Sequence, residues 1–342
     1  MANEIRRDYL LNRYVIVASE RAKRPTDFAV SPIAEAGRIC PFCPGNEEAT
    51  PPADLILLKR GGEVLLSRDV NGARTKEWQV RCFPNLYPAL SPSFEKTFKQ
   101  GSPMPLRSAY GHHEVVVESP NHNDHPGQAS VEQTQLTMKA SLILLRRYYQ
   151  DKKIKYVELF RNHRKEGGAS LSHPHSQIIA LPFIPPKVRS ELTAARRHFE
   201  KKKQCAFCEI IEREEDSQRK IFENNRFLVF SPWASRSPFE FWAIPKQHES
   251  RIENLNGEEV TDLGEAIRVS FGALGRLLHD PPYNYGFHIS PNDSESEFYH
   301  WHLEVYPKLS ILAGFEHSTG VYINVTPPEL AAIALHEMVM NR

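Results

Sequence analysis

The stretch His-Pro-His-Ser-Gln at residues 173–177 places two histidines and an amide at alternate positions, directly before the apolar run Ile-Ile-Ala-Leu at 178–181. In an extended strand, residues two apart project from the same face. We therefore predict that His173, His175 and Gln177 share one face of a β-strand and converge on a catalytic or metal-binding site. The same pattern also fits an edge strand whose histidines have no chemical role.

A loop of small residues, Glu-Gly-Gly-Ala-Ser-Leu-Ser at 166–172, precedes this strand. Small residues let backbone N–H groups approach an anion closely. We expect the glycines, including Gly168, and the hydroxyls of Ser170 and Ser172 to hold phosphate oxygens. The loop and the strand together predict phosphate chemistry at a histidine.

The composition is that of an ordinary globular protein, and 342 residues are enough for two domains. A net charge of +1 argues against nucleic acid as the main ligand, because few phosphates would be neutralised. The N-terminus has no apolar signal segment and no run approaches the length of a membrane span. We therefore expect a cytoplasmic protein that binds neither nucleic acid nor membrane.

The two halves of the chain repeat one order of motifs. A C-x-x-C pair comes first, then a histidine after a strand, a helix, and a histidine that opens H-x-H. The separation between the two histidines is 51 residues in the first half (His122 to His173) and 52 in the second (His248 to His300). The recurrence predicts an internal duplication with a set of four metal ligands in each half.

Two thiolates and two imidazoles are the donors of a closed tetrahedral zinc site. The predicted ligands are Cys40, Cys43, His122 and His173 for the first site, and Cys205, Cys208, His248 and His300 for the second. Iron is an alternative at the second site. The other interpretations are reduced thiols with histidines buried in the core, or a redox C-x-x-C protein.

If His173 binds a metal, His175 is the free histidine on that face. A neutral imidazole is a competent nucleophile, and its attack on an activated phosphate would give a phosphohistidine-type adduct. Gln177 would bind a phosphate oxygen without adding negative charge. In the second half, His302 and Glu304 stand at the equivalent positions, and a carboxylate would repel phosphate. We therefore expect the second half to be structural, or to form a wall of the first site.

We predict an α+β fold with two tandem lobes, residues 1–190 and 191–342, each an antiparallel sheet with packed helices. The helix of the first lobe begins after Ser130 and that of the second after Asn256, both with capping-box spacing. A charged helical connector runs from about Val188 to Lys203.

Three motifs, Cys-Pro-Phe-Cys at 40–43, Ser-Pro-Asn-His at 119–122 and the stretch at 173–177, resemble the galactose-1-phosphate uridylyltransferase family of the histidine triad superfamily. The resemblance spans nearly the whole chain. It implies two histidine-triad-like lobes and a ping-pong reaction. In that reaction His175 takes the uridylyl group from UDP-glucose and passes it to galactose 1-phosphate, with Gln177 as its phosphate partner.

The resemblance also implies binding residues. Nucleotide and phosphate contacts match Arg21, Arg24, Asn85, Asn162, Gly168 and Ser170. Phe315 and Glu316 match a hexose-contacting loop that reaches across a homodimer in the family. A metal site of one carboxylate and three histidines, described in some relatives, would find part of its ligands in Glu191, His288 and His302. The basic turn around Arg21 also fits a solvated surface.

Two positions depart from the family pattern. Ser176 replaces a glycine, and the lysine expected before the hexose loop is absent, with Lys308 as the nearest candidate. The serine, with residues 21–27 and 281–285, also resembles ADP-glucose phosphorylase, which transfers an adenylyl group to phosphate through the same histidine. The retained His-Pro-His motif favours the uridylyltransferase. A zinc-stabilised nucleotide-binding protein without catalysis is the alternative from another class.

Overall fold

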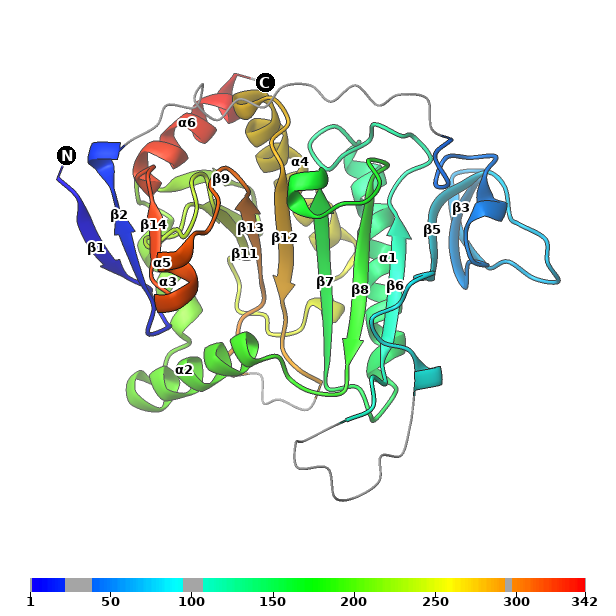
Figure 1. Ribbon diagram of the computed structural model, residues 1–342, viewed down its shortest axis with the longest axis horizontal. Helices are drawn as coiled ribbons and strands as arrows, with labels where there is room; N and C mark the ends of the chain where they lie inside the picture. The colour runs from blue at the N-terminus through cyan, green and yellow to red at the C-terminus, as the bar shows by residue number, and fades with distance from the viewer. Residues whose placement is uncertain (1, 22–38, 95–106, 293–296, 342) are drawn as a thin grey trace.

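The computed structural model describes residues 2–21, 39–94, 107–292 and 297–341. In these ranges a large antiparallel sheet of eleven strands forms the centre of the molecule (Figure 1). Its strands, in spatial order, are β4 (Glu63–Ser67), β3 (Leu55–Arg60), β5 (Trp78–Pro84), β6 (His112–Val117), β8 (His175–Leu181), β7 (Tyr156–His163), β12 (Tyr283–His288), β13 (His302–Pro307), β11 (Phe241–Pro245), β10 (Phe227–Phe230) and β9 (Lys220–Glu223). A small sheet contains β1 (Glu4–Arg7), β2 (Tyr14–Val17) and β14 (Tyr322–Asn324).

The strand order repeats. The first half runs β5-β6-β8-β7 and the second half runs β10-β11-β13-β12. The halves meet edge to edge where β7 pairs with β12, with Asn162 opposite Asn284. The predicted α+β fold of antiparallel sheets with packed helices is therefore confirmed. The predicted domain boundary at residue 190 falls within α2 (Pro186–Lys202) and stays a prediction.

Two long helices cover one face of the large sheet (Figure 1). They are α1 (Val131–Tyr149), between β6 and β7, and α4 (Gly257–Leu278), between β11 and β12. Asn256 and Glu259 form the complete capping box at the start of α4. At α1, Ser130 accepts the Gln133 N–H, but the Gln133 side chain instead donates to the carbonyls of Gln79 and Glu118. It thus ties the helix to two strands.

The remaining helices lie around the sheet. They are α2, α3 (Ala206–Glu214), α5 (Gly314–Thr319) and α6 (Pro328–Met340), with 3-10 turns η1 (Ser19–Arg21), η3 (Glu47–Ala49), η4 (Pro92–Phe94), η5 (Lys165–Gly167) and η6 (Ile252–Asn254). Among the helices of the described ranges, none combines the length and apolar character that a bilayer crossing requires.

The two faces of β8 have different surroundings. Ile178 and Ala180 are buried in the apolar core formed with α1 and α4. His175 and Gln177 alternate with them and project from the opposite face, as the period of a strand requires. The hydrophobic effect therefore holds β8 down on the helices and turns its polar side chains toward the uncovered face.

Glu114 is a buried acid on the helix side of β6. The Tyr148 hydroxyl of α1 donates to its Oε1 at 2.7 Å, whereas its Oε2 has no hydrogen-bond partner among the residues that the structure describes. Burial raises the pKa of this carboxyl to about 8. The folded state therefore binds a proton that the unfolded chain releases near its ordinary value of 4.5.

We expect Glu114→Gln to raise the unfolding free energy at about pH 9 by on the order of 3 kcal/mol and to change it little near pH 5. The reason is that a raised pKa in the folded state lowers the unfolding free energy as the pH rises from the pKa of the unfolded chain to the pKa of the folded protein. Denaturant unfolding across this pH range measures the effect, with the exposed Glu63→Gln as control. Parallel profiles for wild type and Glu114→Gln would contradict the assignment.

Candidate active site and metal groups

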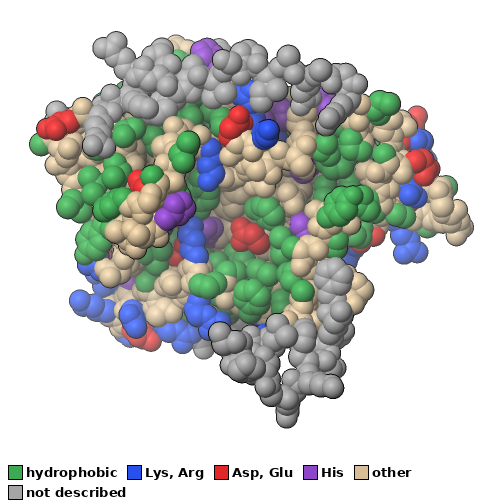
Figure 2. Space-filling view, in the orientation of Figure 1, with side chains coloured by type: hydrophobic (Ala, Val, Ile, Leu, Met, Phe, Trp, Pro, Cys, Tyr) green, Lys and Arg blue, Asp and Glu red, His purple; other side chains and the backbone are tan. Residues whose placement is uncertain are grey.

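His175 lies at the start of β8, between β6 and β7. Its Nδ1 is 2.8 Å from the carbonyl oxygen of His173, so this nitrogen carries the proton and donates it there. The other ring nitrogen, Nε2, therefore keeps its lone pair. Burial lowers the pKa of His175, which holds the ring neutral. Histidine and charged side chains gather near the middle of this face of the molecule (Figure 2).

Gln177 projects from the same face as His175 and lies opposite Val115 of β6 and Phe160 of β7. Its Oε1 is 2.8 Å from Nε2 of His113, and the amide nitrogen of Asn85 is 3.2 Å from the same His113 atom. The structure thus brings together two predicted residues, Gln177 and Asn85. It adds His113, which sequence reasoning missed because the β6–β8 pairing places it there.

The small-residue loop packs against β12. Asn284 donates from Nδ2 to Oδ1 of Asn162 at 2.8 Å and to the Gly167 carbonyl at 2.6 Å. Gly168 follows with φ of 90°, a left-handed conformation that glycine adopts freely. Asn162 and Gly168 are therefore neighbours, and the Cβ that Gly168 lacks would lie 3.6 Å from the Asn162 amide nitrogen.

The two serines of the loop differ. Ser170 is exposed. The Ser172 hydroxyl is 3.0 Å from Nε2 of His122, a predicted metal ligand. The structure therefore places Ser172 behind the predicted metal ligand His122, where it orients the ring, and this contact competes with the phosphate role that we expected.

The first predicted ligand set lies together. Sγ of Cys43 is 3.3 Å from Nδ1 of His122 and 3.5 Å from Nδ1 of His173, and the two nitrogens are 3.3 Å apart. Tetrahedral zinc keeps its ligand atoms roughly 3.3–3.8 Å apart. His173 donates from Nε2 to the Ser119 carbonyl at 2.8 Å, so its Nδ1 lone pair faces the group. With Cys40, these residues could hold a metal ion.

The second set has the same geometry. Sγ of Cys208 is 3.4 Å from Nδ1 of His248 and 3.7 Å from Nδ1 of His300, and Cys205 completes the group. Two sulfurs and two nitrogens favour zinc over iron at this position. Both duplicated sets could therefore hold metal ions.

Glu191, His288 and His302 form a third group that could hold a metal, but a cation of the chain already lies there. The Lys187 ammonium is 3.2 Å from Nε2 of His288 and 2.7 Å from Glu304. Nδ1 of His288 is 2.8 Å from Glu191 and donates to it. Both ring nitrogens of His288 therefore already have partners, Lys187 at Nε2 and Glu191 at Nδ1.

The two H-x-H segments differ in the side chains that cover them. His302, the counterpart of His175, is 1% exposed and stacks on Trp242 at 4.8 Å, whereas His175 is 7% exposed. Glu304, the counterpart of Gln177, is neutralised by Lys187 and by Arg236, whose Nη2 lies 3.0 Å away. The second strand is closed, and the geometry favours reaction at the first.

Phe315 and Glu316, which we expected to contact the sugar, are not near His175 in this chain. Phe315 and Glu316 belong to α5, which lies on the far side of β7, β12 and β13 from β8 (Figure 1). Arg21 ends η1, which follows β2 of the small sheet, and its side chain is not described. Arg24 lies outside the described residues.

A polar cluster lies behind β8, on the helix side. Glu118 forms an ion pair with Arg161, and Nη2 of Arg161 is 2.8 Å from Nδ1 of His125. The Ser176 hydroxyl is hydrogen-bonded to Tyr285 on the same side. The serine that replaces the glycine of the family pattern therefore points away from His175 and Gln177.

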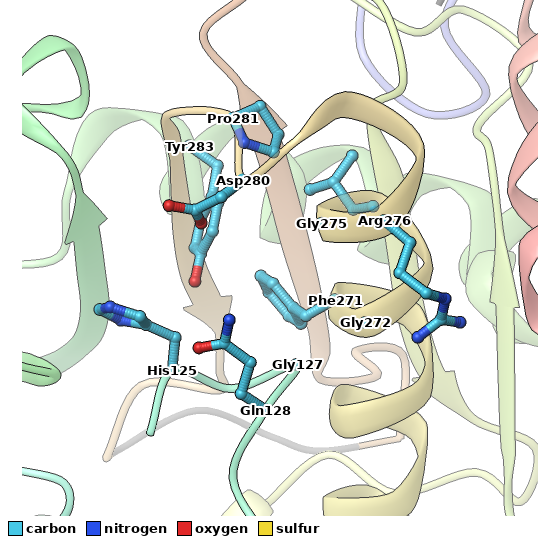
Figure 3. Close-up of a pocket in the computed structure, with 11 residues that line it drawn as sticks. His125, Gly127, Gln128, Phe271, Gly272, Gly275, Arg276, Asp280, Pro281 and Tyr283 are labelled. Carbon is cyan, nitrogen blue, oxygen red and sulfur yellow. The ribbon is translucent and has the colours of Figure 1, made fainter. Parts of the chain in front are cut away.

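A cavity of about 230 Å³ opens beside this cluster, against α4 (Figure 3). His125, Gln128, Asp280 and Tyr283 line it, together with Phe271 of α4. Because His175 and Gln177 project from the opposite face of the sheet, this cavity is separate from the candidate active site.

Comparison with known proteins gives the family. A family profile described as a domain of unknown function (DUF4921) matches residues 111–342. An ADP-glucose phosphorylase of Arabidopsis thaliana is 35% identical, covering 99% of this chain and 93% of the relative. A galactose-1-phosphate uridylyltransferase of Thermotoga maritima is 30% identical, covering 98% of each.

Solved structures agree. The crystal structure of an A. thaliana ADP-glucose phosphorylase with bound ADP-glucose matches with a TM-score of 0.79 and 33% identity, covering 98% of this chain and 99% of that one. A uridylyltransferase structure matches with a TM-score of 0.76 and 30% identity, covering 99% of each chain. Fold and relatives together define an enzyme of the nucleotidyltransferase class. The chain belongs to the family that contains galactose-1-phosphate uridylyltransferases and ADP-glucose phosphorylases, as the sequence motifs predicted.

We expect Ser176→Gly to lower the unfolding free energy by about 1 kcal/mol, because it removes the bond to Tyr285 and adds backbone freedom in a strand. Tyr285→Phe removes the same bond from the other side. Denaturant unfolding of both single variants and the double variant gives the coupling between them. Fully additive losses would show that the two hydroxyls do not interact.

Proposed function

We propose that the chain transfers a nucleotidyl group from a nucleotide-sugar to a phosphate-bearing acceptor through a covalent adduct on His175. The observation that carries the proposal is the bond from His175 Nδ1–H to the His173 carbonyl, which leaves a neutral ring with its Nε2 lone pair available. A buried neutral imidazole beside a phosphate site is suited to nucleophilic catalysis.

In the first step, the Nε2 lone pair attacks the α-phosphorus and the bond from that phosphorus to the bridging oxygen breaks. The sugar 1-phosphate leaves with the electron pair. In the second step, an acceptor phosphate oxygen attacks the same phosphorus, the N–P bond breaks and the imidazole is neutral again. The donor side chains around His175 would stabilise the charge on the non-bridging oxygens in both steps.

Two donor and acceptor pairs fit this chemistry. The first is UDP-glucose with galactose 1-phosphate, which would place the enzyme in galactose metabolism. The second is ADP-glucose with inorganic phosphate. Identity to the A. thaliana ADP-glucose phosphorylase exceeds that to the T. maritima uridylyltransferase, at 35% against 30%. Because the lysine that the family pattern has before the hexose loop is also absent, with Lys308 as the nearest candidate, we rank the ADP-glucose pair first.

The distant residues would complete the site in a homodimer. Phe315 is 44% exposed on α5, far from His175 of its own chain, and would contact the sugar of a second copy. Zinc bound to the two cysteine and histidine sets would supply folding energy, because these closed sets leave no open coordination position. A nucleotide-binding protein without catalysis is the competing function.

The test of the proposal is intact-mass spectrometry after incubation with ADP-glucose or UDP-glucose. We expect an adenylyl increment that inorganic phosphate discharges, and any uridylyl increment to be discharged by galactose 1-phosphate. The increment should map to the peptide with His175 and disappear in His175→Ala. No increment with either donor would favour a binding protein, and an increment at His302 would contradict the assignment of the nucleophile.

Metal analysis tests the ligand sets. We expect two zinc equivalents in the wild type, because the Lys187 ammonium occupies the third group. Cys43→Ser should lose about one equivalent and much stability, because metal binding is coupled to folding. The buried Cys82 lies outside both sets, so Cys82→Ala serves as the matched control with full metal content. A third equivalent in the wild type would contradict the assignment of Lys187.

A further inference from the structure

Three side-chain amides project around the candidate active site, those of Asn85, Asn162 and Gln177. An amide can present either its oxygen or its NH₂ group to a ligand, and only the NH₂ group attracts a phosphate. In each of the three, a donor of the protein engages the oxygen. Each amide orientation follows from a hydrogen bond to a backbone group, because a backbone N–H can only donate and a backbone carbonyl can only accept.

The orientation of Gln177 depends on His113. The Ala89 N–H can only donate, and it lies 3.1 Å from Nδ1 of His113. Nδ1 must therefore be the ring nitrogen that carries no proton. The proton of the neutral ring is on Nε2, which is 2.8 Å from Oε1 of Gln177. His113 thus donates to the Gln177 oxygen and leaves the Gln177 NH₂ group free.

The other charge state of His113 does not fit this arrangement. A protonated ring would carry a proton on Nδ1, directed at the Ala89 N–H. Burial lowers the pKa of His113, in agreement with a neutral ring. The Ala89 N–H fixes the tautomer, and the Asn85 amide nitrogen, 3.2 Å from the protonated Nε2, is then a close contact and not a hydrogen bond.

The two asparagines follow the same rule. The Tyr87 N–H donates to Oδ1 of Asn85 at 2.9 Å, so the amide nitrogen of Asn85 is the group directed toward His113 and the site. Asn284 donates to the Gly167 carbonyl, which identifies its Nδ2, and the same nitrogen meets Oδ1 of Asn162. All three amides therefore have their oxygens occupied. The NH₂ groups of Gln177 and Asn162 are directed to a ligand, whereas the Asn85 amide nitrogen lies 3.2 Å from Nε2 of His113.

We propose that His113 is a positioning residue of the reaction, which fixes the Gln177 amide so that its NH₂ group faces the phosphate of the nucleotide. The inference rests on the proposed function. Without the His113 donor, the Gln177 amide can rotate by 180° and present its oxygen, which repels a phosphate oxygen as a carboxylate would. His113 therefore acts through Gln177 and does not touch the substrate.

The experiment measures the rate of nucleotidylation of His175 in a single turnover, with ADP-glucose and with UDP-glucose. His113→Phe keeps a ring but has no donor, and we expect it to slow adduct formation by about tenfold or more. His113→Gln can place an amide nitrogen near the position of Nε2, and we expect it to recover most of the rate. Metal content and thermal midpoint of both variants control for folding.

A double variant separates positioning from a structural role. If His113 acts through Gln177, then His113→Phe should have no further effect in a Gln177→Leu background, because the amide to be oriented is absent. Independent, multiplying losses would overturn the inference. An unchanged rate in His113→Phe would also overturn it, whereas the absence of any adduct in the wild type would overturn the proposed function instead.

The tautomer can be tested without substrate. Nitrogen-15 NMR of labelled protein distinguishes a protonated from an unprotonated ring nitrogen, and assignment by comparison with His113→Gln identifies the signal. We expect a neutral ring protonated at Nε2 in the wild type. A proton on Nδ1 would overturn the inference whatever the activity.

Discussion

The pairing of β8 between β6 and β7 is the constraint on which the site depends. It brings the Ser119 carbonyl, just beyond β6, to Nε2 of His173, so that the other nitrogen of that ring faces the metal group. The chain directly after β6 is tied to the same segment, because the Glu118 N–H donates to the Pro174 carbonyl at 3.0 Å. Backbone carbonyls thus select which nitrogen of each histidine is available, at His173 for the proposed metal and at His175 for the proposed substrate.

The duplicated half shows what this framework does without the reaction. His302 also directs Nδ1 to a carbonyl two residues earlier, that of His300, at 3.2 Å. The difference lies in the neighbours. Trp242 covers the ring and Lys187 and Arg236 neutralise Glu304, so a phosphate would find neither space nor free donors. The same backbone arrangement therefore presents an uncovered histidine in the half where we propose the reaction and a covered one in the other half.

Local patterns allowed much of the fold to be predicted. The caps at Ser130 and Asn256 lie within their own turns, and the alternation around His175 depends only on strand geometry. The duplicated ligand sets could be found from spacing, because each set recurs. His113 and Lys187 could not, because both act across strands or helices distant in sequence. The two halves join through β7 and β12. This junction brings α2, which follows the first half, to β12 and β13 of the second half, where Lys187 meets His288 and Glu304.

The metal groups and the reaction site are coupled through the third residue of each C-x-x-C pair. Phe42 packs edge-on against the His175 ring at 5.3 Å, and Phe207 packs against His302 at 4.9 Å. A metal ion that held Cys40 and Cys43 together would also hold Phe42, which limits the rotation of the His175 ring. Because Phe207 does the same where no reaction is expected, the coupling belongs to the duplicated framework. What distinguishes the first half is the uncovered face and the amides whose oxygens the protein has occupied, and the proposed reaction depends on both.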